Sequence, residues 1–297
     1  MATKKSKTPH SGRNRSEGWK YAKKTGHSLE STLADQVTQD SEFSNALHWA
    51  CFGLNDKSGA TATTGAANAR RVDCVLGGKT PRKIDVLVEW QNGRTARISL
   101  KKSAGGQVWL IMSERLFLAF EGHYKEQVPD NVKSCFKKFI GPLSDPELTY
   151  ACRNSLHRDL EQHQQRLVGS TLRVNEPTSW SATLCWLQEK VPQLTELCFS
   201  RGLCEKPEDH ADFVWYYTEP NVQPANLEIY RIADIVAGVR KVTPKDRATI
   251  GLKNGGSTVV LPFGFLQMHR PKKKNQAQFH HDRDKVRRLA HTGKPIR

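Results

Sequence analysis

The stretch that decides the fold is IDVLVEWQNGRTARISLK, residues 84–101. From Ile84 to Trp90, β-forming apolar residues recur at every second position, which is the period of a strand with one buried face. Asn92-Gly93 follows, and this pair between two alternating segments is a strong signal for a tight turn. Residues 95–100 then return as a partner strand. The stretch therefore predicts an antiparallel β-hairpin joined by a two-residue turn.

Helical and strand patterns surround this hairpin. Residues 28–51 carry an apolar stripe after a capping residue, Ser28, and predict one helix. Residues 57–70 are small and polar and predict a loop, 107–112 predict a third, more buried strand, and residues from 130 to about 203 are mostly helical. Late strands are expected at 213–217, 227–232, 248–252, 258–261 and 265–269. This order of elements predicts a single α/β or α+β domain.

The positive charge of the chain is concentrated at its two ends. The formal net charge is +16, of which residues 1–28 contribute +7, residues 268–297 contribute +8 and the remainder only +1. Residues 1–16 predict a flexible basic arm and residues 282–297 a basic tail, with His280 and His281 expected in the same solvated segment. Such ends favour a polyanionic partner, and nucleic acid is favoured over a membrane surface because no amphipathic apolar face accompanies the basic runs.

Several classes of protein are disfavoured by composition. No apolar run is long enough for a membrane span, and the basic N-terminus lacks the apolar segment of a secretory signal. The seven cysteines are odd in number and form no C-x-x-C pair, which predicts neither a disulfide framework nor a zinc knuckle. Free thiols in a reducing cytoplasm are the expectation.

Chemistry-bearing side chains converge at the open end of the predicted hairpin. Asp85 begins one strand, and Ser99 and Lys101 end the other on a shared face. A carboxylate, a hydroxyl and an ammonium therefore meet at one rim of the sheet. Oxygen ligands suit a hard divalent cation, and phosphodiester cleavage needs charge neutralisation. Taken alone, Asp85 and Lys101 also suit an ordinary cross-strand ion pair of little energetic value.

This pattern resembles the PD-(D/E)XK nucleases, and type II restriction endonucleases in particular. The resemblance rests on Asp85, the hairpin and Lys101, on Glu30 within a preceding helix, and on the GWKYAK segment at residues 18–23. It covers residues 18–121 well and 245–281 loosely. The resemblance implies a restriction-endonuclease-like core with a central mixed β-sheet flanked by helices. One nuclease domain is expected over 17–281, with its catalytic core at 28–121, a helical insertion at 130–205 and late strands at 210–281.

The resemblance also implies roles for individual residues. Asp85 and the Leu100 carbonyl would bind Mg²⁺, with Glu30 holding a metal-bound water or Lys101, and Lys101 would orient or deprotonate the attacking water. Gln107 would help to position phosphate or water. Two departures stand out: Ser99 occupies the position of the family's usual acid, and Pro81 lies four residues before Asp85 instead of next to it.

Candidate DNA contacts flank this site. Arginine and glutamine side chains can read base edges, whereas lysines act as point charges toward phosphates. The candidates by residue type and position are Arg70, Arg71, Arg82, Lys102, Gln267, Arg270, Lys272, Lys273, Lys274 and Gln278.

The function expected from the sequence is Mg²⁺-dependent, site-specific cleavage of double-stranded DNA by a cytoplasmic homodimer. A homodimer is expected because a two-fold symmetric pair cuts both strands of a palindrome. Two alternatives remain open: a structure-specific repair or recombination nuclease of the same fold, and a non-catalytic DNA- or RNA-binding protein.

Overall fold

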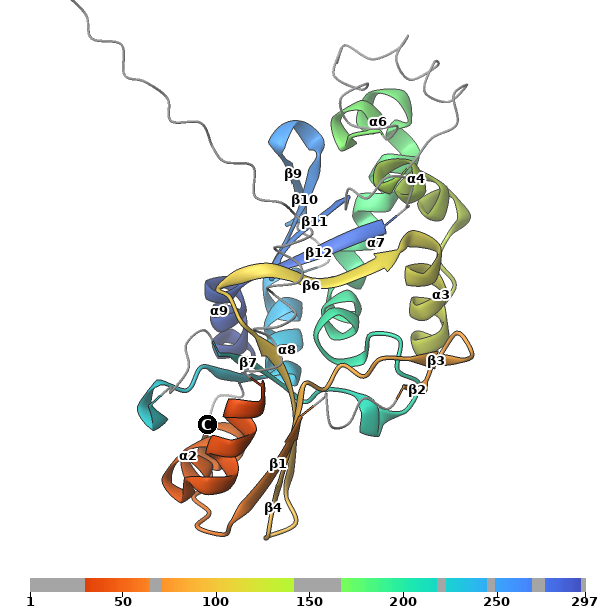
Figure 1. Cartoon of the computed structure of the whole chain (residues 1–297). Coiled ribbons are helices and arrows are strands. Elements are labelled where there is room, and N and C mark those ends of the chain that lie inside the picture. The colour runs from red at the N-terminus through yellow and green to blue at the C-terminus, as the bar shows by residue number, and fades with distance from the viewer. Residues whose placement is uncertain are drawn as a thin grey trace, which may run out of the picture.

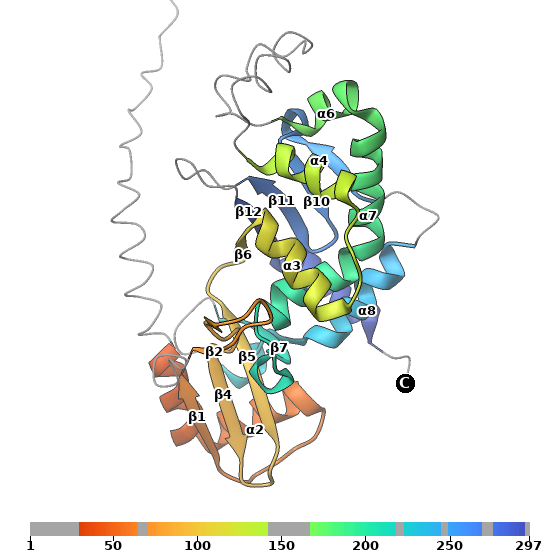
Figure 2. The same ribbon diagram turned by 90° about the vertical axis from the view of Figure 1, so that its right-hand side faces the viewer.

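The computed structural model describes residues 30–64, 71–141, 167–217, 223–244, 249–268 and 276–294. These residues form two five-stranded β-sheets with helices packed against them (Figures 1 and 2). The first sheet is mixed and the second is antiparallel throughout. The predicted class, an α/β fold with a mixed sheet flanked by helices, is therefore confirmed. In the part of the chain that the structure describes, no helix is long and apolar enough to cross a membrane.

The first sheet contains the predicted hairpin. Its strands lie in the order β1 (Ala60–Thr64), β4 (Val86–Trp90), β5 (Thr95–Lys101), β7 (Phe213–Tyr216) and β8 (Ile229–Arg231). Neighbours are antiparallel except for β5 and β7, which run in parallel. The chain between these two parallel strands makes a long crossover connection. Residues of this connection form much of the larger of the two hydrophobic clusters. A strand at 60–64 corrects the predicted loop over 57–70, because its threonines and alanines pair with β4 at the sheet edge.

The hairpin turn differs by one residue from the prediction. Val86 pairs with Ile98 and Glu89 with Thr95, and the Trp90 amide donates to the Arg94 carbonyl. The turn therefore has three residues, 91–93, and Gly93 adopts the left-handed conformation that such loops require, with φ at 83°. This register places Asp85 opposite Ser99, whereas a two-residue turn would place it opposite Leu100; Asp85, Ser99 and Lys101 still lie at the open end of the hairpin, as predicted.

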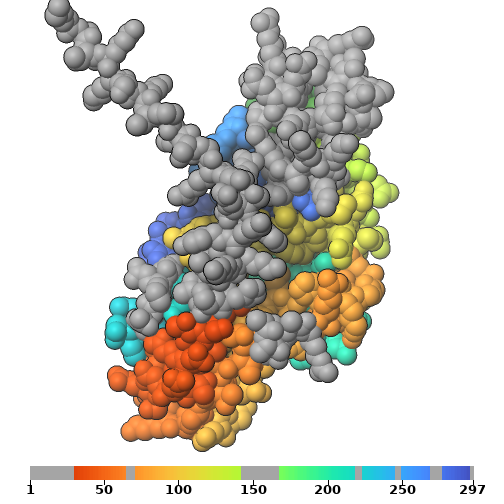
Figure 3. Space-filling view, viewed as in Figure 1, coloured from red at the N-terminus to blue at the C-terminus, as the bar shows by residue number. Residues whose placement is uncertain are grey.

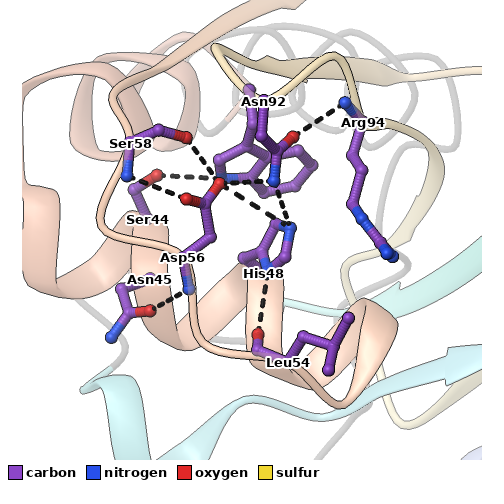
Figure 4. A network of polar contacts seen from close by, with 9 residues as sticks. Ser44, Asn45, His48, Leu54, Asp56, Ser58, Asn92 and Arg94 are labelled. Carbon is purple, nitrogen blue, oxygen red and sulfur yellow. Dashed lines mark hydrogen bonds and ion pairs between the residues drawn. The ribbon is translucent and has the colours of Figure 1, made fainter.

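A polar network fixes the closed end of the hairpin to the preceding helix (Figure 4). The Asn92 amide donates to Asp56 at 2.7 Å and lies 3.2 Å from His48 Nε2, while His48 Nδ1 lies 2.8 Å from the Leu54 carbonyl. The Trp90 indole donates to Ser44. His48 is almost fully buried, so its ring nitrogens need the partners they find here. The network holds the hairpin against the helix.

The predicted helix over 28–51 is two helices. Residues 30–39 are helical, Asp40 interrupts the helix, and α2 follows as Ser41–Phe52. The Asp40 carboxylate accepts hydrogen bonds from the amides of Glu42 and Phe43, both at 3.0 Å, which is N-cap geometry. The weak apolar stripe across residues 39–41 therefore marks a true boundary. Residues 28 and 29 lie outside the described residues.

We expect Asp40→Ala to lower the free energy of unfolding by about 1 kcal/mol, the usual value of an N-cap, because two amides of α2 lose their acceptor. Urea denaturation measures this change. Asp35→Ala, which removes an exposed carboxylate from the preceding helical turns, is the control and should change stability by at most about 0.5 kcal/mol. Equal effects of the two substitutions would contradict the cap.

The second sheet has the order β6 (Gly105–Met112), β12 (Gln276–Asp282), β11 (Gly264–Met268), β10 (Thr258–Leu261) and β9 (Gly251–Lys253). The predicted third strand is thus present, but it pairs with β12 instead of with the hairpin. A two-stranded ribbon, β2 (Val72–Asp73) and β3 (Lys79–Thr80), precedes the hairpin. The first sheet forms the lower part of the molecule in Figure 1, and the second sheet lies above it. In the space-filling view of Figure 3, the red and orange residues from the N-terminal part of the described chain form the lower end of the molecule.

Helices cover one face of each sheet. The residues of α2 and the helical turns before it pack with Val86, Val88 and Ile98 in one hydrophobic cluster. A larger cluster joins the second sheet to the remaining helices. These helices are α3 (Ser113–Tyr124), α4 (Asp130–Ile140), α6 (Gly169–Asn175), α7 (Pro177–Glu196), the π-helical turn η2 (Leu197–Arg201), α8 (Ile232–Val242) and α9 (Arg283–Gly293). Short 3-10 turns are η3 (Pro207–Asp209), η4 (Pro224–Asn226) and η5 (Asn254–Gly256).

Two of these helices, α8 and α9, correct predictions for the C-terminal part of the chain. The expected strand over 227–232 is limited to β8, and the chain turns at Ile232 into α8. The expected basic tail from residue 282 contains α9, whose Val286, Leu289 and Ala290 are buried. Asp282 caps α9 by accepting from the Lys285 amide. The basic residues of α9 therefore belong to a packed helix and not to a solvated tail. The basic arm over 1–16 lies outside the described residues.

Candidate active site

Asp85, Ser99 and Lys101 meet as the hairpin register requires. Asp85 Oδ2 accepts from the Leu100 amide at 2.7 Å and from the Ser99 hydroxyl at 3.2 Å. The Lys101 ammonium donates to Ser99 Oγ at 2.7 Å and to the Leu100 carbonyl at 3.2 Å. Ser99 is buried, and the Asp85 and Lys101 side chains are half-buried. Carboxylate, hydroxyl, carbonyl and ammonium thus form one continuous polar cluster, and Asp85 and Lys101 are linked through Ser99.

Two lysines share the low-dielectric surroundings of this cluster. Burial lowers the pKa of Lys101, and the nearby Lys102 charge lowers it further, whereas Asp85 acts in the opposite direction. Burial and the Lys101 charge lower the pKa of Lys83 to about 8. The Lys83 ammonium donates to the Cys198 carbonyl at 2.9 Å and lies over the Trp109 ring. Lys83 is absent from the predicted site residues, although its position two residues before Asp85 is a signal for it.

Glu30 lies beside this cluster and accepts a hydrogen bond from Lys102 at 2.9 Å. Its side chain is 12% exposed and that of Lys102 is 32% exposed. This ion pair bridges the first described helix and the end of β5. Lys102, a predicted DNA contact, is therefore engaged within the protein. The role of Glu30 toward a metal-bound water stays a prediction.

Predicted catalytic and base-reading glutamines meet on the second sheet. Gln278 Nε2 donates to Gln107 Oε1 at 2.9 Å, and Gln267 Nε2 donates to Gln278 Oε1 at 3.2 Å and lies 3.1 Å from His280 Nε2. Gln267 and Gln278 alternate with the buried positions of their strands, and the bulge between Phe279 and His280 places Gln107 opposite His280. The three glutamines therefore lie on the sheet face opposite the hydrophobic core. The His280 ring stacks on Phe265 at 4.3 Å. We call Gln107, Gln278, Gln267 and His280 the amide row.

His281 connects the second sheet to the Asp85 cluster. It is buried on the inner face of β12, and its Nδ1 lies 3.0 Å from the Tyr216 hydroxyl. Burial, and after it the Lys101 charge, lowers the pKa of His281 to about 4. The expected solvated position of this histidine is therefore wrong. The period-two pattern of residues 276–282 is the sequence signal that points to its buried place in a strand.

This depressed pKa predicts a loss of stability in acid. Because the folded-state pKa lies below the ordinary value of His, the unfolded state takes up the proton first as the pH falls from about 6.5 toward 4. We expect the penalty from His281 to reach roughly 2 kcal/mol at pH 5. Urea denaturation of wild type and His281→Gln at pH 7.5 and pH 5 measures it. The variant should lose less stability on acidification, and an equal loss in both proteins would contradict the assignment.

Arg82, a predicted DNA contact, forms an ion pair within the protein. Its Nε donates to Asp209 Oδ1 at 2.6 Å, and the Asp209 side chain is only 5% exposed. This pair fastens the chain just before Asp85 to η3. Arg82 therefore has a structural partner, and its role as a DNA contact stays a prediction.

Arg82→Ala should lower the free energy of unfolding by about 2 kcal/mol, because it leaves the buried Asp209 carboxylate without its cation. Lys79→Ala is the matched control: its partner Asp73 is exposed, so the loss should stay below about 1 kcal/mol. Urea denaturation at pH 7 compares the two variants. If both lose the same small amount, the Arg82 pair has no structural role.

The remaining predicted DNA contacts divide into two groups. Arg71 is described and its side chain is exposed, and Gln267 and Gln278 belong to the amide row. Those outside the described residues are Arg70, Arg270, Lys272, Lys273 and Lys274.

The donor set at Asp85 fits a hard divalent cation. Mg²⁺ keeps several waters and takes one or two carboxylates with further oxygen ligands. The Leu100 carbonyl and the Ser99 hydroxyl already accept hydrogen bonds from a cationic group, the Lys101 ammonium, and both lie beside the Asp85 carboxylate. Among the described residues no group of three or more His, Cys, Asp or Glu side chains gathers as a metal site. The oxygen set at Asp85, with its one carboxylate, suits a cation that also contacts substrate.

Comparisons with known proteins add little to this geometry. No protein-family model matches the chain, and no curated protein matches it. Among solved structures, restriction endonuclease MspI in complex with its cognate DNA is similar with a TM-score of 0.46 and 12% sequence identity, over 92% of this chain and 93% of that chain. A likeness this distant decides neither activity nor site.

Proposed function

We propose that this protein is a Mg²⁺-dependent, site-specific endonuclease of double-stranded DNA, of the type II restriction class. The observation that carries the proposal is the hydrogen-bonded cluster of Asp85, Ser99 and Lys101 next to the Leu100 carbonyl. A surface ion pair would not need a buried hydroxyl between its partners. Here a carboxylate, two neutral oxygens and an ammonium lie at one rim of a hairpin, and phosphodiester hydrolysis uses such a set of groups.

The protein groups would divide the chemistry between them. Asp85, Leu100 O and Ser99 Oγ would hold Mg²⁺, which supplies an activated water and neutralises the charge of the phosphate. The Lys101 ammonium would stabilise the charge that develops on the phosphate oxygens. In its neutral amine form, which the lowered pKa favours, Lys101 could instead accept the proton of the attacking water and become the ammonium. The packed surroundings of Lys83 and His281 would fix these groups before substrate binds.

The amide row supports recognition of duplex DNA. A glutamine amide offers a donor and an acceptor and pairs best with adenine in the major groove. The hydrogen bonds of the row fix the orientation of each amide. Because β5 leads into β6, Gln107 of the row follows the catalytic hairpin within a few residues. Contacts from the basic terminal segments to phosphates would add affinity without sequence information.

The experiment offers purified protein two substrates in Mg²⁺: linear duplex DNA of defined sequence and a four-way junction. The proposal expects discrete fragments from the linear duplex. Cleavage of the junction alone would favour the alternative repair or recombination nuclease. Tight binding of both substrates with no cleavage of either would favour the non-catalytic nucleic-acid-binding alternative.

We further propose a homodimer in the cytoplasm. Two copies related by a two-fold axis would present two Asp85 clusters to the two strands of a palindromic site. The described cysteines are all free thiols, which supports a reducing compartment. They are Cys51, Cys74, Cys135, Cys185, Cys198 and Cys204. Sedimentation with and without a palindromic duplex tests the dimer.

A further inference from the structure

A large polar cleft lies at the other end of the parallel strand pair from Lys101. Its volume is about 770 Å³, and it opens between the start of β5 and β7 on one side and α8 on the other. Arg94, Arg97, Arg231 and Arg240 line it. None of the residues of the Asp85 cluster is among its lining residues, so the cleft is separate from the candidate active site. Arg97 and Lys101 are four residues apart on β5, a distance of about 13 Å along a strand.

The four arginines come from two walls of the cleft. Arg94 and Arg97 belong to the hairpin, whereas Arg231 ends β8 and Arg240 lies in the last turn of α8. The Arg94 guanidinium lies over the Phe52 ring at 5.1 Å and extends away from the hairpin network (Figure 4). The Arg231 and Arg240 side chains are exposed. Guanidinium groups therefore line a common space from opposite sides.

The acidic residues that line the cleft are already paired. Asp212 accepts two hydrogen bonds from Arg97, at 2.7 and 2.9 Å, and the Arg97 guanidinium also donates to the Pro207 carbonyl. Glu196 accepts from Arg201 and from the Tyr124 hydroxyl. Both lining carboxylates are therefore neutralised by the arginines that they already bind.

The cleft therefore keeps an excess of positive charge. Arg231 and Arg240 form no ion pair with any residue that the structure describes, and neither lining carboxylate is left to neutralise them. Arg94 adds a third guanidinium, whose contact in the cleft is the face of the Phe52 ring. Charge inside a concave site is screened less than charge on a flat surface, so this excess attracts anions.

We propose that this cleft is a second anion site that takes a phosphate-bearing ligand. Arginine forks match phosphate oxygens in pairs, and a ligand with two or more phosphates would engage both walls at once. The phosphates can come from the backbone of a nucleic acid or from a free polyphosphate, and both sources have the same recognition chemistry. This site does not depend on the nuclease activity, because it shares no residue with the Asp85 cluster.

The experiment uses full-length protein in EDTA, so that no Mg²⁺-dependent cleavage occurs. Calorimetric titrations with sodium tripolyphosphate and with a short DNA duplex compare wild type, Arg231→Gln/Arg240→Gln and the matched control Arg115→Gln/Arg173→Gln. The control removes the same charge from exposed positions of α3 and α6 outside the cleft. Thermal unfolding confirms that each variant folds. We expect a loss of affinity of about tenfold or more in the cleft variant alone, for one or both ligands.

The two ligands separate the two sources of phosphate. A loss for tripolyphosphate only assigns the cleft to a free polyphosphate or nucleotide, and a loss that includes the duplex assigns it to a nucleic-acid backbone. As an independent readout, the bound ligand should protect Arg231 and Arg240 from phenylglyoxal, as measured by mass spectrometry. Binding of neither ligand by wild type, or equal losses in the cleft and control variants, would overturn the proposal.

Discussion

Asp85→Asn is expected to reduce the rate of Mg²⁺-dependent DNA cleavage by at least about 10³-fold while changing DNA affinity by less than about tenfold. The asparagine oxygen can still accept from the Leu100 amide, so the hairpin should keep its structure. The substitution removes the single negative charge that the cluster offers to a cation. Gel-based cleavage rates and binding titrations in Ca²⁺ measure the two effects separately.

A second carboxylate near the same hairpin provides the control for this experiment. Glu89 lies close to the turn, at the far end of β4 from Asp85, and its side chain is exposed. Glu89→Gln removes the same charge without touching the cluster, so it should cleave at close to the wild-type rate. An Asp85→Asn protein that retains its cleavage rate in Mg²⁺ would remove Asp85 from the active site.

Lys101→Gln should cause the second large loss, about 10²-fold to 10³-fold in cleavage rate. This substitution removes the ammonium that contacts both Ser99 and the Leu100 carbonyl. Lys102→Gln is the matched control, because the neighbouring lysine forms its ion pair with Glu30. We expect Lys102→Gln to lose less than about tenfold in rate, because it leaves the contacts of Lys101 with Ser99 and the Leu100 carbonyl in place. Single-turnover cleavage measures both variants.

Lys101→Arg refines the role of the ammonium. Arginine keeps the positive charge but does not give up its proton in proteins. If Lys101→Arg keeps the wild-type cleavage rate, Lys101 acts through charge stabilisation alone. If its cleavage rate falls, the result supports proton transfer by Lys101. Equal rates for wild type and Lys101→Gln would contradict both roles.

The hairpin could be predicted because its signals are local. The alternation of residues 84–90 and the Asn92-Gly93 turn depend only on neighbours in sequence, and the juxtaposition of Asp85 with Ser99 follows from the register. The one-residue error in the turn changes the residue opposite Asp85 from Leu100 to Ser99, but it leaves the candidate residues at the open end. Asp40 illustrates the same point, since a capping residue lies at the position where the helical pattern weakens.

Long-range pairing could not be read from the sequence. The strand pattern of residues 107–112 is correct. Nothing local indicates that β6 pairs with β12, because the two strands are far apart in sequence: Gln107 and Gln278 are separated by 171 positions. The packing of α8 against α9 likewise turns an apparently solvated basic tail into a covered helix. The ion pair of Arg82 could not be predicted for the same reason, because its partner Asp209 is distant in sequence. Residue type suggests these groups for DNA contact, whereas tertiary partners decide their roles.

The measurement that tests the central claim most directly is digestion of a long, unmethylated linear DNA by purified protein, with Mg²⁺ and with EDTA in parallel. Site-specific hydrolysis at the Asp85 cluster predicts a reproducible set of discrete fragments in Mg²⁺ and intact DNA in EDTA. Intact DNA under both conditions, or the same fragments in EDTA, would contradict the account.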